Sequence, residues 1–217
     1  DGLKGFTEKN SNKIYKTQGA GICIDNSTGS VVAAVGGRSQ TTKGYTLNRA
    51  YQSYRQPGSS IKPLIVYTPA LENGYTANTI VADHKFEGGP SNAGNTYHGK
   101  IKLSEAVQRS LNTVAWQIFD KLTPKVGIAY LYKMDFSNIV KTDETLAASL
   151  GGLTNGVSPL EMAKAYATIA NDGTYRDPTC IARITTADGT KVWENDHEES
   201  VVYTQDAARQ MTQILQG

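Results

Sequence analysis

Residues 55–63 read Arg-Gln-Pro-Gly-Ser-Ser-Ile-Lys-Pro and pass directly into the apolar run Leu-Ile-Val-Tyr at 64–67. This stretch predicts a helix from Ser59 to Leu71, which the sequence Glu-Asn-Gly at 72–74 ends. A serine and a lysine three residues apart at the start of a helix share one face of its first turn. We therefore expect the side chains of Ser59 and Lys62 to lie within hydrogen-bonding distance.

This serine–lysine pair has the elements of a nucleophile and its base. A hydroxyl is a weak nucleophile until a base takes its proton, and a lysine kept neutral by burial can act as that base. The start of a helix also favours negative charge that develops on oxygen. Ser60 is only two residues from Lys62 and would face elsewhere, so Ser59 is the candidate nucleophile. The alternative is that Ser59 caps the helix and Lys62 lies solvated on its surface, and the spacing alone does not decide between them.

A second candidate pair, Ser110 and Asn112, lies about 50 residues downstream. Apolar residues recur there at helical spacing, which predicts one helix over 104–121 with Ser104 as its N-cap and Ser110 on the apolar stripe. The Ser110 hydroxyl could relay a proton from Lys62, and the Asn112 amide could hold a peptide-like substrate by its backbone. The alternative is an ordinary polar position on a helix.

The remaining pattern predicts short strands near both ends of the chain and helices between them, which indicates an α/β protein of the α+β type, an antiparallel sheet packed against a helical layer. Residues 1–16 are polar and are expected to be a tail or the remnant of an element that precedes the domain, and 75–100 are expected to form a long irregular surface segment. The Ser-Pro-Leu-Glu sequence at 158–161 is a capping box with proline at the first helical position. The predicted elements are hairpins over 18–35 and 180–193, and helices over 124–133, 158–170 and 204–215.

Composition excludes several classes of function. The chain has 217 residues, of which 39% are hydrophobic, and a net charge of +2, which suits one core and does not indicate a nucleic-acid partner. Cys23 and Cys180 lie in apolar contexts and are predicted to be small core residues without a disulfide. His84, His98 and His197 have no ligand-like spacing, so we expect them to be solvated and expect no metal. No run approaches the ~20 apolar residues of a membrane span, so any anchor lies outside this chain.

The order and flanks of these motifs resemble the transpeptidase domain of class A (bifunctional) penicillin-binding proteins. Ser-x-x-Lys followed by Ser-x-Asn forms the first two of the three motifs that mark serine penicillin-recognising enzymes. The resemblance runs from about Thr17 to the end, so 17–217 is identified as one truncated transpeptidase domain. The matching segments are Val35-Gly-Gly-Arg38, Leu47-Asn-Arg-Ala50, Arg55-Gln-Pro-Gly58, Gln108-Arg-Ser-Leu-Asn-Thr113, Leu150-Gly-Gly-Leu-Thr-Asn-Gly-Val-Ser-Pro-Leu160 and Tyr166-Ala-Thr-Ile-Ala-Asn-Asp-Gly-Thr-Tyr175.

The resemblance implies a D,D-transpeptidase that cross-links peptidoglycan stem peptides ending in D-Ala-D-Ala. Ser59 would form the acyl-enzyme, and its backbone N–H would supply half of the oxyanion hole. Lys62 would be the base, Ser110 would pass the proton to the leaving nitrogen, and Asn112 would bind the substrate amide. β-Lactam antibiotics would acylate the same serine. The family needs no cofactor or metal, and it works at the extracytoplasmic face of the bacterial membrane.

One departure from the family is large. The third motif, Lys-Thr-Gly or Lys-Ser-Gly, should follow the helix at 204–215, and these 217 residues do not contain it. We therefore expect the fragment alone to be inactive and to need the complementary C-terminal fragment of the domain. The enzymatic alternatives are a D,D-carboxypeptidase or a β-lactamase, in which water resolves the acyl-enzyme. A penicillin-binding sensor that acylates without turnover is the alternative of another class.

Overall fold

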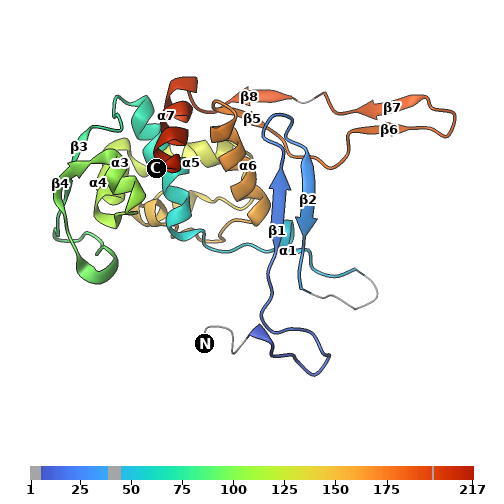
Figure 1. Cartoon of the computed structure of the whole chain (residues 1–217), viewed down its shortest axis with the longest axis horizontal. Helices are drawn as coiled ribbons and strands as arrows, with labels where there is room; N and C mark the ends of the chain where they lie inside the picture. The colour runs from blue at the N-terminus through green and yellow to red at the C-terminus, as the bar shows by residue number, and fades with distance from the viewer. Residues whose placement is uncertain (1–5, 39–44, 197) are drawn as a thin grey trace.

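The helices gather in one body, and the strands lie at its periphery (Figure 1). The computed structural model describes residues 6–38, 45–196 and 198–217. Helices and antiparallel strands are both present, so the predicted α+β class is confirmed. None of the helices in the described part of the chain is both long and apolar enough to span a bilayer.

The helix predicted over 59–71 is present as a helical stretch over 58–72 whose pitch changes twice. It begins as the 3₁₀ helix η2 (Gly58–Ile61), widens into the π-helical η3 (Pro63–Tyr67) and ends as the α-helix α2 (Thr68–Glu72). Pro63 has no N–H to donate to the turn before it. The Thr68 N–H bonds to the Pro63 carbonyl five residues back, and the Thr68 hydroxyl donates to the same oxygen over 2.7 Å. The wider turn therefore follows from the proline and its threonine partner.

The π-helical stretch η3 lies at the centre of the core. All five of its residues are buried, and it packs against α2, α4 (Asn112–Leu122) and α5 (Pro124–Lys133). The Tyr203 hydroxyl donates to the Leu64 carbonyl over 2.7 Å, which ties the segment before α7 (Gln205–Gln216) to η3. The residues that follow Lys62 are thus buried and packed, which fixes the backbone on that side of the candidate base.

Three predicted helices are confirmed. The helix expected over 124–133 is α5, and the last helix is α7 with Thr204 as its N-cap. The capping box forms as expected at the start of α6 (Pro159–Ala170). There, the Ser158 N–H donates to Glu161 Oε2 over 2.7 Å, and the Glu161 N–H donates to the Ser158 hydroxyl over 3.3 Å. A local sequence motif was sufficient to predict this helix start because both partners lie within one turn.

The strands form four antiparallel pairs in the described residues, which confirms the predicted antiparallel pairing, although the pairs do not join into a single sheet in this part of the chain. The two predicted hairpins are confirmed, with turns at Asn26–Gly29 and Ala187–Gly189. Each strand is only three to five residues long, and among the described residues each is bonded along its length to a single partner strand. The pairs are β1 (Gly21–Ile24) with β2 (Val31–Val35), β3 (Ile80–Asp83) with β4 (Gly99–Lys102), β5 (Thr174–Arg176) with β8 (Glu199–Val201), and β6 (Arg183–Thr185) with β7 (Lys191–Glu194).

The segment 75–100 is more ordered than its composition predicts. Its two ends pair as β3 and β4, and only 84–98 between them is irregular apart from the short 3₁₀ helix η4 (Ala93–Asn95). The strand β3 alternates exposed and buried residues and places the Asp83 carboxylate in the interior. Sequence patterns missed it because a four-residue strand that ends on a buried charge has little apolar signal.

Two further expectations are wrong. The helix expected over 104–121 is divided into α3 (Leu103–Gln108) and α4, and α3 has Lys102 rather than Ser104 as its N-cap. Cys23 and Cys180 are exposed free thiols rather than core residues. Cys23 lies in β1, where the apolar pattern of a hairpin strand suggested burial, but the described residues leave that position open to solvent. The remaining short helices are α1 (Arg49–Gln52), η5 (Lys141–Asp143) and η6 (Leu146–Leu150).

Candidate active site

Ser59 lies in the 3₁₀ turn η2 with an exposed side chain. Among the described residues, none forms a hydrogen bond with its hydroxyl. The neighbouring Ser60 is engaged at both ends, because its hydroxyl donates to the Pro57 carbonyl over 2.7 Å and its carbonyl accepts from the Tyr166 hydroxyl over 2.8 Å. Of the two serines, Ser59 is therefore the one whose oxygen is available to a substrate.

Lys62 is buried, with 1% of its surface exposed. Its Nζ donates to the Ser110 carbonyl over 2.8 Å, to the Ser110 hydroxyl over 3.2 Å and to Asn112 Oδ1 over 2.7 Å. Burial lowers the pKa of Lys62 from its usual 10.5 to about 8, because the charged form loses its hydration. The solvated lysine of the alternative interpretation is excluded.

The predicted hydrogen bond between Ser59 and Lys62 is not formed in the described residues. An ammonium group has three donors, and all three of Lys62 are directed at Ser110 and Asn112. The two residues are joined instead through the backbone, where the Lys62 N–H donates to the Ser59 carbonyl. They share one helical turn, as the spacing predicts, but the resting lysine is bonded to the downstream motif.

Ser110 lies in the break between α3 and α4, not on a helical stripe. Its N–H donates to the Val107 carbonyl over 2.9 Å, and the Leu111 N–H donates to the Ala106 carbonyl over 3.0 Å, which is the hydrogen-bond pattern of a Schellman motif. Ser110 has φ +52° at the position usually taken by glycine, and buried Leu111 follows it. The left-handed residue ends α3 and directs its own carbonyl and hydroxyl toward Lys62. Strain of this kind in a non-glycine residue is common at functional sites.

Asn112 is the first residue of α4, and its amide has contacts at both ends. Oδ1 accepts from Lys62, and Nδ2 donates to the Ser91 carbonyl over 2.8 Å. A carboxamide nitrogen has two N–H groups, and no described residue accepts a second hydrogen bond from this one. Three of the four predicted residues, Lys62, Ser110 and Asn112, are thus in direct contact, and Ser59 is one turn away from them.

The sequence did not predict that residues 150–157 contact the backbone just before Ser59. Arg55 and Val157 form an antiparallel bridge, with N–H to carbonyl distances of 2.9 and 2.8 Å in the two directions. Gly151 has φ +84° and lies so close to Gly58 that a Cβ placed on it would be 2.3 Å from the Gly58 nitrogen. Residues 150–157 therefore form the wall against which the Ser59 turn is built. Their glycines were visible in the sequence, but the partner lies almost 100 residues away.

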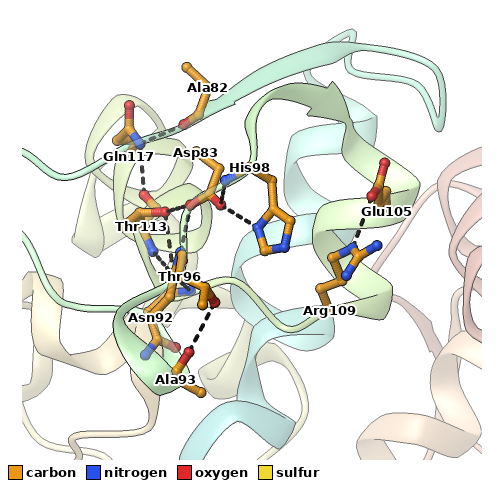
Figure 2. A network of polar contacts seen from close by, with 11 residues as sticks. Ala82, Asp83, Asn92, Ala93, Thr96, His98, Glu105, Arg109, Thr113 and Gln117 are labelled. Atoms are coloured by element: carbon orange, nitrogen blue, oxygen red, sulfur yellow. Dashed lines mark hydrogen bonds and ion pairs between the residues drawn. The ribbon is translucent and has the colours of Figure 1, made fainter.

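The sequence also missed the network around Asp83. This buried carboxylate accepts hydrogen bonds from Asn92, Thr113 and His98 (Figure 2). His98 was expected to be solvated, and its ring Nδ1 instead lies 2.9 Å from Asp83 Oδ2. His84 is exposed, and His197 lies outside the described residues. Within 6–38, 45–196 and 198–217, no three His, Cys, Asp or Glu side chains gather as a possible metal site.

Residues 19–217 match the family described as the penicillin binding protein transpeptidase domain. Penicillin-binding protein 1F of Bacillus subtilis (strain 168) is 37% identical over 203 residues, which cover 92% of this chain and 28% of that protein. Penicillin-binding protein 4 of the same organism is 34% identical over 202 residues, which cover 91% of this chain and 32% of that protein. The chain spans less than a third of the length of these curated relatives.

A solved structure gives the same result for the fold. The structure of the PonA1 protein from Mycobacterium tuberculosis in complex with penicillin V matches with a TM-score of 0.77 at 23% identity, and the match covers 92% of this chain and 56% of that chain. The predicted penicillin-binding transpeptidase fold is confirmed by this likeness. At that identity the comparison carries the fold alone, and the chemistry depends on the contacts described above.

Proposed function

The chain belongs to the penicillin-binding protein transpeptidase family, and from this membership we propose that it supplies the acylating residues of a serine-type D,D-transpeptidase that cross-links peptidoglycan. The observation that carries the proposal is Lys62, a buried lysine with a pKa of about 8, held by Ser110 and Asn112 one turn from the free hydroxyl of Ser59. Each of the four residues then has a distinct role that its contacts support.

In the first step, neutral Lys62 takes the proton of the Ser59 hydroxyl as that oxygen attacks the carbonyl carbon of the penultimate D-Ala. The developing oxyanion is stabilised by the Ser59 backbone N–H. The C–N bond then breaks, and Ser110 passes the proton from Lys62 to the departing amine of the terminal D-Ala. The peptide remains as an ester on Ser59 until the amino group of a neighbouring strand attacks it and forms the cross-link. A β-lactam would acylate Ser59 by the same first step.

The lengths of the three contacts of Lys62 support this relay. A neutral amine keeps two N–H donors and gains one lone pair. The two shorter contacts, to the Ser110 carbonyl and to Asn112 Oδ1, can both persist. The longest contact, 3.2 Å to the Ser110 hydroxyl, is the one that deprotonation gives up, which leaves the lone pair of Nζ to accept the Ser59 proton. Once Nζ has taken that proton, it can donate to the Ser110 hydroxyl again, and Ser110 can pass a proton on to the departing amine.

The proposed partners follow from the family. The donor substrate is a peptidoglycan stem peptide ending in D-Ala-D-Ala, which places the domain at the extracytoplasmic face of the bacterial membrane. Asn112 would bind the peptide amide through its second N–H. The Lys-Thr-Gly strand of the family, absent from these 217 residues, would complete the oxyanion hole. We expect the 217 residues alone to be inactive, and to be acylated at Ser59 when a segment bearing that motif is added.

Labelling with a fluorescent penicillin, followed by intact mass measurement, tests the proposal on the natural protein that carries these 217 residues. The expected result is one covalent adduct, absent in Ser59→Ala and retained in the control Ser60→Ala. An adduct that persists in Ser59→Ala would overturn the assignment of the nucleophile. Release of D-Ala from a stem peptide over many turnovers is expected of a transpeptidase, whereas a single acylation event that stalls would indicate a sensor.

A further inference from the structure

The Asp83 carboxylate is the buried centre of a polar network outside the four residues already assigned (Figure 2). Its Oδ1 accepts from Asn92 Nδ2 over 2.6 Å and from the Thr113 hydroxyl. Its Oδ2 accepts from the His98 N–H over 2.8 Å and lies 2.9 Å from His98 Nδ1. Burial alone would raise the pKa of Asp83, but the donors outweigh it and the pKa is lowered. Asp83 is therefore an anion whose acceptor positions are filled.

Asn92 joins this anion to the start of α4. Its Nδ2 donates to Asp83, which leaves Oδ1 directed at the first N–H groups of the helix. That oxygen accepts from the Asn112 N–H over 2.8 Å and from the Thr113 N–H over 3.2 Å. A helix leaves these N–H groups without partners inside itself, and α4 has no capping side chain of its own. A residue 20 positions upstream thus caps the helix that begins with Asn112.

The same loop also holds the Asn112 side chain. The Ser91 carbonyl accepts from Asn112 Nδ2 over 2.8 Å. Asn112 is consequently fixed at its backbone N–H by Asn92 and at its side-chain amide by Ser91. Its Oδ1 is then directed at Lys62 Nζ, 2.7 Å away, and its second Nδ2–H is left for a substrate carbonyl.

We propose that Asn92, anchored by Asp83, is a positioning residue for the acyl-transfer reaction, which sets the orientation of Asn112 toward Lys62 and toward the substrate amide. This inference rests on the proposed function for its effect on rate, but its geometric part does not. Misplacement of a reacting group by about 1 Å can slow a reaction ~100-fold. The loop 84–98 is then a part of the active site that binds no reacting atom itself.

The first test is a double-mutant cycle on the natural protein, read as the second-order rate constant of acylation by a fluorescent penicillin. Asn92→Ala is expected to slow acylation roughly 10- to 100-fold, and to have little further effect in an Asn112→Ala background because both act through one side chain. Thr96→Ala is the matched control. Among the described residues its hydroxyl bonds only to the Ala93 carbonyl in the same loop, and its backbone carbonyl, which accepts from Asn92 Nδ2, is kept in the variant. Equal rates for Asn92→Ala and Thr96→Ala, or effects of Asn92 and Asn112 that multiply independently, would overturn the proposal.

The second test needs no activity. Amide hydrogen exchange at Asn112 and Thr113 is expected to accelerate in Asn92→Ala and to stay unchanged in Thr96→Ala, and unchanged exchange in both would refute the positioning role. If the wild-type protein is not acylated at all, the proposed function fails, while exchange still decides whether Asn92 holds Asn112. Should Asn92→Ala not fold, Thr113→Val, which removes one donor to Asp83, carries the acylation test and the exchange test at Asn112 with a smaller expected change.

Discussion

The site around Lys62 and the hairpin β6–β7 differ in how well their residues agree with local preferences for backbone conformation and burial. Near Lys62 the chain departs from local preferences, with a π-helical stretch, a left-handed Ser110 and a lysine that is 1% exposed. In the hairpin the Asp-Gly turn and the strand residue Trp193 both suit their positions, yet Trp193 remains 42% exposed. Agreement with local sequence preferences therefore does not identify the candidate active site. The site is identified by departures from those preferences that the packing of the fold maintains.

The largest effect is expected from the variant that tests whether buried Lys62 acts as the base for Ser59. Lys62→Ala removes the proposed base, so acylation by penicillin should slow roughly 100- to 10,000-fold. Lys125→Ala, which removes an exposed lysine from α5, is the control and should acylate at the wild-type rate. Stopped-flow labelling measures both. Near-normal acylation of Lys62→Ala would show that another group takes the proton from Ser59.

The next largest effect is expected from the variant that tests the close contact between Gly151 and Gly58, the residue before Ser59. In Gly151→Ala, the new Cβ would meet the Gly58 backbone at 2.3 Å, and a left-handed alanine is strained as well. The backbone before Ser59 must then shift, so we expect the free energy of unfolding to fall by more than about 2 kcal/mol and acylation to slow. Chemical denaturation measures the first quantity and labelling the second. An unchanged acylation rate would mean that this wall does not position the nucleophile.

The smallest effect comes from the same substitution in the hairpin. Gly189 has φ +89°, close to that of Gly151, but a Cβ added there would meet nothing within 4 Å. Gly189→Ala should therefore lose only the cost of a left-handed alanine, about 1–2 kcal/mol, with wild-type acylation. The difference between the two variants isolates the contribution of the Gly58 contact. Equal losses of stability in both variants would show that this contact contributes little.

The same contrast explains what the sequence could predict. The capping box of α6 and the hairpin turns were predicted because their partners lie within a few residues of one another. The pair Ser110 and Asn112 was identified by motif order, but the break between α3 and α4 was not, since Ser110 takes a position where glycine is the usual signal. The contacts of residues 150–157 and of the loop 84–98 with the site were not predicted either. Gly151 meets Gly58 and Asn92 meets Asn112 only in the folded chain, and a single sequence carries no mark of such contacts.

The fold converts Lys62 into a base by burying it, and NMR titration of ¹³C-labelled lysine measures this effect on Lys62 itself. We expect a pKa of about 8, so that the fraction of neutral amine and the acylation rate increase together as the pH rises through this value. Because the unfolded chain keeps a lysine pKa of about 10.4, the penalty for burying the charge should disappear between about pH 8 and pH 10. A Lys62 pKa near 10.4 in the folded protein would show that burial does not make this lysine a base.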